Sequence, residues 1–209
     1  VIHPNVMLTK SADLLTIVRV HGREFECAMP DDQNQICRRF EAAMRGFSED
    51  FRIYQYLIKT EWSGIGAKPV GHPLVDRVSA DRLQHLNKSD AGLFAVEIFW
   101  VISYEGLSGT LNRRPGLGQR FSLKRNLEAA EAEVHRARDL LLDKVRGLVE
   151  QLQDVVRIEI LGEADGVQFL RRLLNYNPEK LVPVGLSDPS AVDFHVCNST
   201  LECHSDHLK

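Results

Sequence analysis

The strongest structural signal in this sequence is a long run of helical periodicity between Leu123 and Leu152. Apolar side chains recur there at intervals of four and three residues until Lys144 interrupts the pattern, which predicts a single long amphipathic helix. Glu133 and Arg136, three residues apart, support it as a charged pair. Such a helix must bury its apolar stripe against other elements along its whole length. The stripe consists of Leu123, Leu127, Ala130, Val134, Ala137, Leu141, Leu148 and Leu152.

Runs of β-branched, aromatic and apolar residues predict the strands. Residues 14–20 precede a turn at 21–23 and a second short run at 24–27, which together predict a hairpin. Residues 92–104 are apolar on both faces, so we expect them to form a central strand. Three further segments predict strands: residues 51–60, 155–160 and 192–196.

Shorter helices separate these strands. Apolar residues from Ile36 to Phe47 follow the 3.6-residue period, with Asp31 and Asp32 as the expected cap. Residues 79–86 and 166–176 predict two more helices, the second stopped by Pro178. Glycine and proline mark residues 62–73 and 113–120 as loops.

This order of elements predicts an α+β fold with mixed or antiparallel sheets packed against helices. A loose recurrence of strand, helix and strand suggests two ferredoxin-like α/β sandwich units. We expect one domain over residues 1–209, or two sub-units over 1–110 and 120–209. Because the chain begins at Val1 and its last residues carry no stop-like glycine or proline, we interpret it as part of a longer protein.

Composition narrows the function classes. The net charge of −3 argues against a domain built mainly to neutralise nucleic-acid phosphates. No run reaches the ~20 apolar residues of a membrane span, and no secretory signal is recognisable, so we expect a cytosolic protein. The four cysteines favour reduced thiols in a chain large enough to fold without disulfides. They are Cys27, Cys37, Cys197 and Cys203.

A glycine-rich segment, Ser63 to Pro69, superficially resembles a phosphate-binding loop. A P-loop requires Gly-x-x-x-x-Gly-Lys followed by Ser or Thr, so that successive amides surround the phosphates. Here Pro69 follows Lys68, which removes an amide and blocks the start of a helix. We interpret this segment as an ordinary loop.

Two other patterns are candidates for chemistry. The tail combines His195, Cys197, Cys203, His204 and His207, but their spacing is not that of a usual zinc site. A small metalloprotein using this tail remains an alternative to buried cysteines and solvated histidines. Neither Cys37 nor Cys197 lies in a motif that activates a thiol. We therefore assign no catalytic, cofactor-binding or metal-ligating residue.

Strand aromatics offer a further alternative, a ferredoxin-like nucleic-acid-binding adaptor. Such a module stacks bases on its sheet, but it also needs an RNP-like strand and a basic face, and neither is present. We expect these aromatics to fill the core instead. They are Tyr54, Tyr56, Phe94, Phe99 and Trp100.

Several segments share a pattern with one known family. They are residues 14–25, 37–45, 54–59, 94–100 and 191–204. In this pattern the chain resembles the amino-terminal domain of the CagE/TrbE/VirB family of type IV secretion, or conjugative-transfer, ATPases. The similarity covers most of the chain.

The resemblance implies a parent protein with a P-loop motor domain after residue 209, which would bind ATP and Mg and power assembly or DNA and protein transfer. None of the motor's catalytic residues falls in this chain, so we expect it to be non-catalytic and free of cofactors. The family's amino-terminal domain contributes to docking on inner-membrane secretion proteins at the cytoplasmic face and to hexamer-like homo-oligomers. The helix 123–152 is a candidate surface, together with Arg113, Arg114, Arg120, Lys124 and Arg125.

Overall fold

The computed structural model describes residues 3–23, 29–61, 66, 69–87, 94–107, 123–175 and 196. These residues form two compact units. Unit 1 contains the residues up to Gln55 and those from Phe99 onward, and unit 2 spans Tyr56–Ile98. The predicted boundary between sub-units 1–110 and 120–209 lies outside the described residues.

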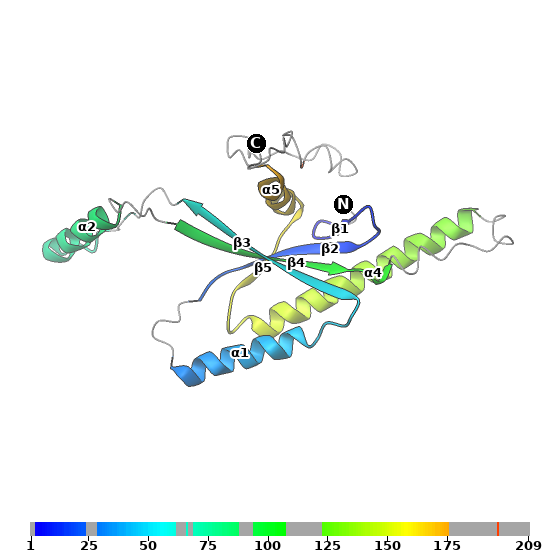
Figure 1. Cartoon of the computed structure of the whole chain (residues 1–209), viewed down its shortest axis with the longest axis horizontal. Coiled ribbons are helices and arrows are strands. Elements are labelled where there is room, and N and C mark those ends of the chain that lie inside the picture. The colour runs from blue at the N-terminus through cyan, green and yellow to red at the C-terminus, as the bar shows by residue number, and fades with distance from the viewer. Residues whose placement is uncertain are drawn as a thin grey trace, which may run out of the picture. The chain divides into compact units, whose positions relative to one another are not determined.

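One five-stranded antiparallel sheet organises the fold (Figure 1). Its strands are β1 (Met7–Leu8), β2 (Leu14–Val20), β4 (Phe94–Tyr104) and β3 (Phe51–Glu61) in that order, while β5 (Ile158–Ile160) also pairs with β2. Strand β1 pairs with the start of β2, at Leu14 and Leu15, and β5 with its end, at Val18 to Val20. One edge of β2 is therefore shared by two short strands.

The predicted α+β fold is confirmed. Helix α1 (Pro30–Met44) follows β2 in the chain, and α4 (Leu123–Leu152) follows β4. If β1 is left aside, the strand order is β5-β2-β4-β3, which is the ferredoxin-like arrangement. Helix α2 (Pro73–Asn87) is inserted between β3 and β4, and α5 (Glu163–Leu174) follows β5. The described residues contain one such unit rather than two, because strands from both halves of the chain join the same sheet.

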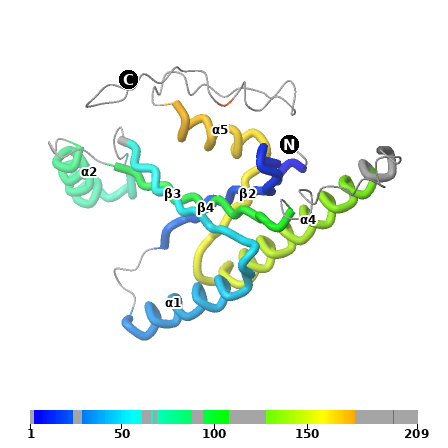
Figure 2. The backbone as a smooth tube through the Cα atoms, turned by 45° about the vertical axis from the view of Figure 1, so that its right-hand side comes forward, coloured from blue at the N-terminus to red at the C-terminus, as the bar shows by residue number. Residues whose placement is uncertain are grey.

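Helices cover both faces of the sheet in unit 1, as Figure 2 shows. Phe99 and Trp100 are consecutive on β4, so their side chains point to opposite faces. The ring of Trp100 meets Phe40 of α1 with centroids 6.1 Å apart, and the ring of Phe99 meets Phe169 of α5 at 4.7 Å. Helix α4 packs beside α1 and against β2 and β5. The core therefore lies in two layers, one on each side of β4.

The interruption of the long apolar stripe at Lys144 has a structural reason. Lys144 of α4 donates a hydrogen bond from Nζ to the carbonyl oxygen of Gly46, 2.8 Å away, just beyond the end of α1. Carbonyl groups at the end of a helix have no partner within it, and a lysine is a favourable donor there. The charged residue therefore helps to join α1 to α4.

Several boundaries differ from the sequence-based predictions. Helix α1 begins at Pro30 after Met29, whose side chain makes no capping bond, and Asp31 and Asp32 lie in its first turn rather than forming the cap. Strand β5 begins only at Ile158, because the N–H groups of Val155 and Val156 both donate to Leu152 at the end of α4. The second strand of the predicted hairpin, residues 24–27, lies outside the described residues.

Candidate functional site

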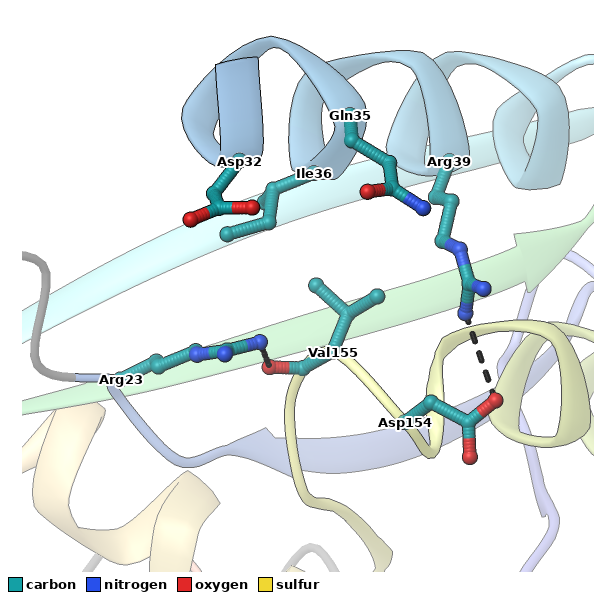
Figure 3. Close-up of a pocket in the computed structure, with 7 residues that line it drawn as sticks. All are labelled: Arg23, Asp32, Gln35, Ile36, Arg39, Asp154 and Val155. Atoms are coloured by element: carbon teal, nitrogen blue, oxygen red, sulfur yellow. Dashed lines mark hydrogen bonds and ion pairs between the residues drawn. The ribbon is translucent and has the colours of Figure 1, made fainter. Parts of the chain in front are cut away.

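A pocket of ≈ 260 Å³ opens between α1 and the turn that follows α4 (Figure 3). In this view, side chains from successive turns of α1 point toward Arg23 and the residues that follow α4. Ile36 and Val155 supply the apolar part of the lining, and the other lining residues are Arg23, Asp32, Gln35, Arg39 and Asp154.

The polar groups of this pocket are balanced in charge. Nη1 of Arg39 lies 3.3 Å from Oδ2 of Asp154, and Nη1 of Arg23 donates to the carbonyl oxygen of Val155 at 3.4 Å. Both carboxylates of the lining are exposed, and none of its residues is a serine, cysteine or histidine that could act as a nucleophile or base. The volume is also below the ~300–1,000 Å³ of typical small-molecule sites. The pocket therefore has neither the size nor the nucleophile of a typical small-molecule active site.

The residues that sequence analysis considered for chemistry are not brought together in the described structure. Of the glycine-rich loop, the structure describes Gly66 and Pro69, and both are exposed. Cys37 lies exposed on α1. Within the described ranges, no three His, Cys, Asp or Glu residues are arranged to hold a metal ion. The tail candidates His195, Cys197, Cys203, His204 and His207 lie outside these ranges.

The strand aromatics divide between core and surface. Phe99 and Trp100 are only 1% and 6% exposed, so neither can stack on a nucleic-acid base. Trp100 also donates from Nε1 to Oε1 of Gln55 at 3.1 Å. Phe94 is exposed on unit 2, where the Nζ of Lys59 lies 3.7 Å from the centre of its ring. The expectation that these aromatics fill the core is confirmed for the two on the inner half of β4. It is wrong for Phe94 and Tyr54, which are 45% and 49% exposed, and Tyr56 is half-buried.

Unit 2 exposes apolar side chains that sequence analysis did not single out. None of the described residues of α2 is buried, and Leu74, Val75 and Val78 are 71%, 44% and 62% exposed. We call these three residues the α2 surface. The sequence did carry a signal for them, since Pro73 at the first helical position places all three in the first two turns of a helix. The predicted helix, residues 79–86, began too late to include them.

The start of α2 is fixed by one carboxylate. Asp76 accepts hydrogen bonds from the N–H groups of Val70, at 2.7 Å, and Gly71, at 3.2 Å. Gly71 has a φ of +86°, a conformation that favours glycine. The carboxylate therefore holds the preceding backbone against the helix, and the α2 surface is presented on a defined structure.

These features describe an α+β ferredoxin-like domain with exposed apolar side chains on α2. Residues 5–110 match the family model described as type IV secretion system ATPase VirB4/TrbE, N-terminal domain. The chain therefore belongs to the VirB4/TrbE family of type IV secretion ATPases, as an N-terminal domain. No curated protein matches the sequence.

The structure also bears on two other expectations, the absence of a membrane span and the basic residues near the long helix. No helix in the described part of the chain is long and apolar enough to cross a membrane. Of the basic residues near the long helix, Arg113, Arg114 and Arg120 lie outside the described ranges, while Lys124 and Arg125 belong to the first turn of α4.

Proposed function

We propose that this chain is a non-catalytic docking and oligomerisation domain of a type IV secretion ATPase. In this proposal the domain attaches the ATPase to inner-membrane secretion proteins at the cytoplasmic face and to further copies in a hexamer-like ring. A P-loop motor domain of the same protein binds ATP and Mg and supplies the energy for assembly or for DNA and protein transfer. The chain itself holds no cofactor.

The observation that supports this proposal most directly is the apolar exposure of unit 2. Its described residues include seven large exposed hydrophobic side chains and no buried one. Apolar exposure on this scale, with no buried side chain beneath it, is one mark of a surface that another macromolecule covers. The seven are Leu57, Val70, Leu74, Val75, Val78, Phe94 and Val96.

The first test removes the α2 surface from the complete ATPase. The triple variant Leu74→Ser, Val75→Ser, Val78→Ser should shift the protein to smaller oligomers in analytical ultracentrifugation and weaken its co-purification with reconstituted inner-membrane secretion proteins. Losing this apolar area should weaken binding by at least about tenfold, since apolar anchors dominate interface energies.

The matched control changes three exposed polar residues of the same helix, Arg77→Ser, Gln84→Ser and His85→Ser. It lowers helix propensity at least as much as the test variant, because valine and serine have similar propensities, but it keeps the α2 surface, so assembly should be retained. Equal assembly of the two triple variants would count against docking through α2.

Separately, calorimetry on this chain should detect no ATP binding, and a measurable affinity would contradict the non-catalytic role.

A further inference from the structure

Helix α2 has one half-buried side and one exposed side. Leu74, Val78 and Asp81 are exposed at positions i, i+4 and i+7. Arg77, three residues after Leu74, is exposed as well. Residues at these spacings lie on one face of an α-helix, so apolar and charged side chains share that face. The half-buried residues of α2 recur at helical spacing on the other side: Asp76, Ser79, Leu83 and Leu86.

The charges of α2 are balanced. Apart from His85, its charged residues are two aspartates, each followed directly by an arginine, and they are Asp76, Arg77, Asp81 and Arg82. A strongly acidic or strongly basic partner would therefore gain little from this helix. Among the described residues, Arg77 and Asp81 form no ion pair. Their charges are thus not neutralised by a neighbour in the described structure.

A second copy of the same helix, running antiparallel, presents the opposite charge to each of these two residues. Arg77 and Asp81 lie two residues on either side of Ser79. A two-fold axis at the level of Ser79 therefore places Arg77 of each copy beside Asp81 of the other. Because a helix rises ~1.5 Å per residue, the same axis brings the two Val78 residues within about 3 Å of each other along the helix direction. The contact then has an apolar centre flanked by two charge pairs.

We propose that α2 binds α2 of a second copy, antiparallel and about this two-fold axis. This pairing rests on the proposed oligomerisation of the domain, and it names the surface and the register through which two copies meet. Val78 contacts its own counterpart, Leu74 extends the apolar contact, and the charge pairs set the direction of the second helix. Exposed ion pairs fix orientation more than they add affinity, so removal of Arg77 alone, as in the control variant above, leaves assembly largely intact.

The test reverses one charge in each of two variants of the complete chain and then mixes them. In Arg77→Asp both contacts set acid against acid, and in Asp81→Arg both set base against base. Each variant alone should therefore self-associate at least about tenfold more weakly than the unchanged chain in sedimentation velocity. In the mixture each contact again joins an acid to a base, so association should return to within about threefold of the unchanged chain. A charge pair within one helix cannot produce this recovery, because mixing leaves the charges of each chain as they were.

The matched control makes the same charge reversals on α1, where Arg38 and Glu41 are both exposed. Arg38→Asp and Glu41→Arg should leave self-association unchanged, alone and mixed. Circular dichroism of every variant checks that its helices are intact.

A cysteine tests the position of the axis without changing any charge. In a chain that also carries Cys37→Ser, Val78→Cys should form a disulfide between copies under mild oxidation, because the axis brings the two residues within disulfide reach. Gln84→Cys should not, since this axis separates the two copies of residue 84 by about 15 Å along the helix direction. This measurement also decides the matter if either charge variant fails to fold.

Three results would overturn self-pairing of α2. They are an unchanged chain that stays monomeric as its concentration rises, mixed charge variants that associate no better than either one alone, and cross-linking at residue 84 as efficient as at residue 78. In each case the triple α2 variant could still lose its binding to inner-membrane secretion proteins, and docking through α2 would then stand. Recovery on mixing without any loss of that binding in the triple variant would instead support self-pairing and count against docking on those proteins.

Discussion

The two units of this domain bury very different amounts of apolar surface. In unit 1, Phe99 and Ile102 of β4 and Leu141 of α4 are at most 1% exposed. In unit 2, no described side chain is buried, although β3 and β4 continue into it from unit 1 and α2 adds fifteen residues of helix. A two-stranded ribbon or a single short helix is marginally stable in water. Unit 2 therefore depends on the strands that it shares along the chain, and its described apolar side chains stay exposed.

The largest expected effect compares the same substitution in the two units. Leu148→Ala, at a position 2% exposed, should lower the free energy of unfolding by about 2–5 kcal/mol because it leaves a cavity between α4 and its neighbours. Leu74→Ala, at a position 71% exposed, should change it by no more than about 0.5 kcal/mol. Urea denaturation measures both. Similar losses would mean that Leu74 is covered within the domain, and the contrast between the units would fail.

A smaller loss of stability is expected when a positively charged side chain is replaced in each of the two units. Lys144→Met should cost about 0.5–1.5 kcal/mol, because the carbonyl group of Gly46 loses its donor and α1 loses a link to α4. Arg77→Met on the exposed face of α2 should cost no more than about 0.5 kcal/mol. Thermal unfolding distinguishes the two variants. A Lys144→Met variant as stable as the unchanged chain would show that this bond is replaced by water.

The smallest effect should be visible only in alkaline solution. Burial raises the pKa of Tyr104 above its usual 10.0, and the negative charges of Asp50 and Glu133 raise it further. Its neutral form is favoured in the folded state, so its contribution to stability is complete below pH ~10 and is lost as the pH rises through the folded-state pKa. Tyr104→Phe should therefore flatten the fall in stability above pH 10. Parallel pH profiles for the two proteins would show that Tyr104 contributes nothing to it.

Elements with a complete local pattern could be predicted from the sequence. The bounds of α4 coincide with the apolar stripe from Leu123 to Leu152, because its periodicity is complete within the helix. Four residues of the stripe are buried: Ala137, Leu141, Leu148 and Leu152. Strand β4 was likewise expected to be central, and it lies between β2 and β3. Its outer half, however, is less buried than its apolar sequence suggested, with Phe94 and Val96 exposed. A pattern shows that a side chain prefers burial, not that a neighbour is present to bury it.

The candidate surfaces could not be predicted for the same reason. The α2 surface became recognisable only once the described structure placed no side chain over Leu74 and Val78. Asn175, which directly follows α5, donates from Nδ2 to the carbonyl oxygen of Val196 at 2.7 Å, and the local sequences of these two residues contain no sign of each other. Periodicity and turn chemistry act over a few residues, and they determined the elements of this protein. Contacts between distant residues, which only the tertiary structure decides, determined the rest. They set the strand order, the sharing of one edge of β2, the partner of Lys144 and the exposure of unit 2.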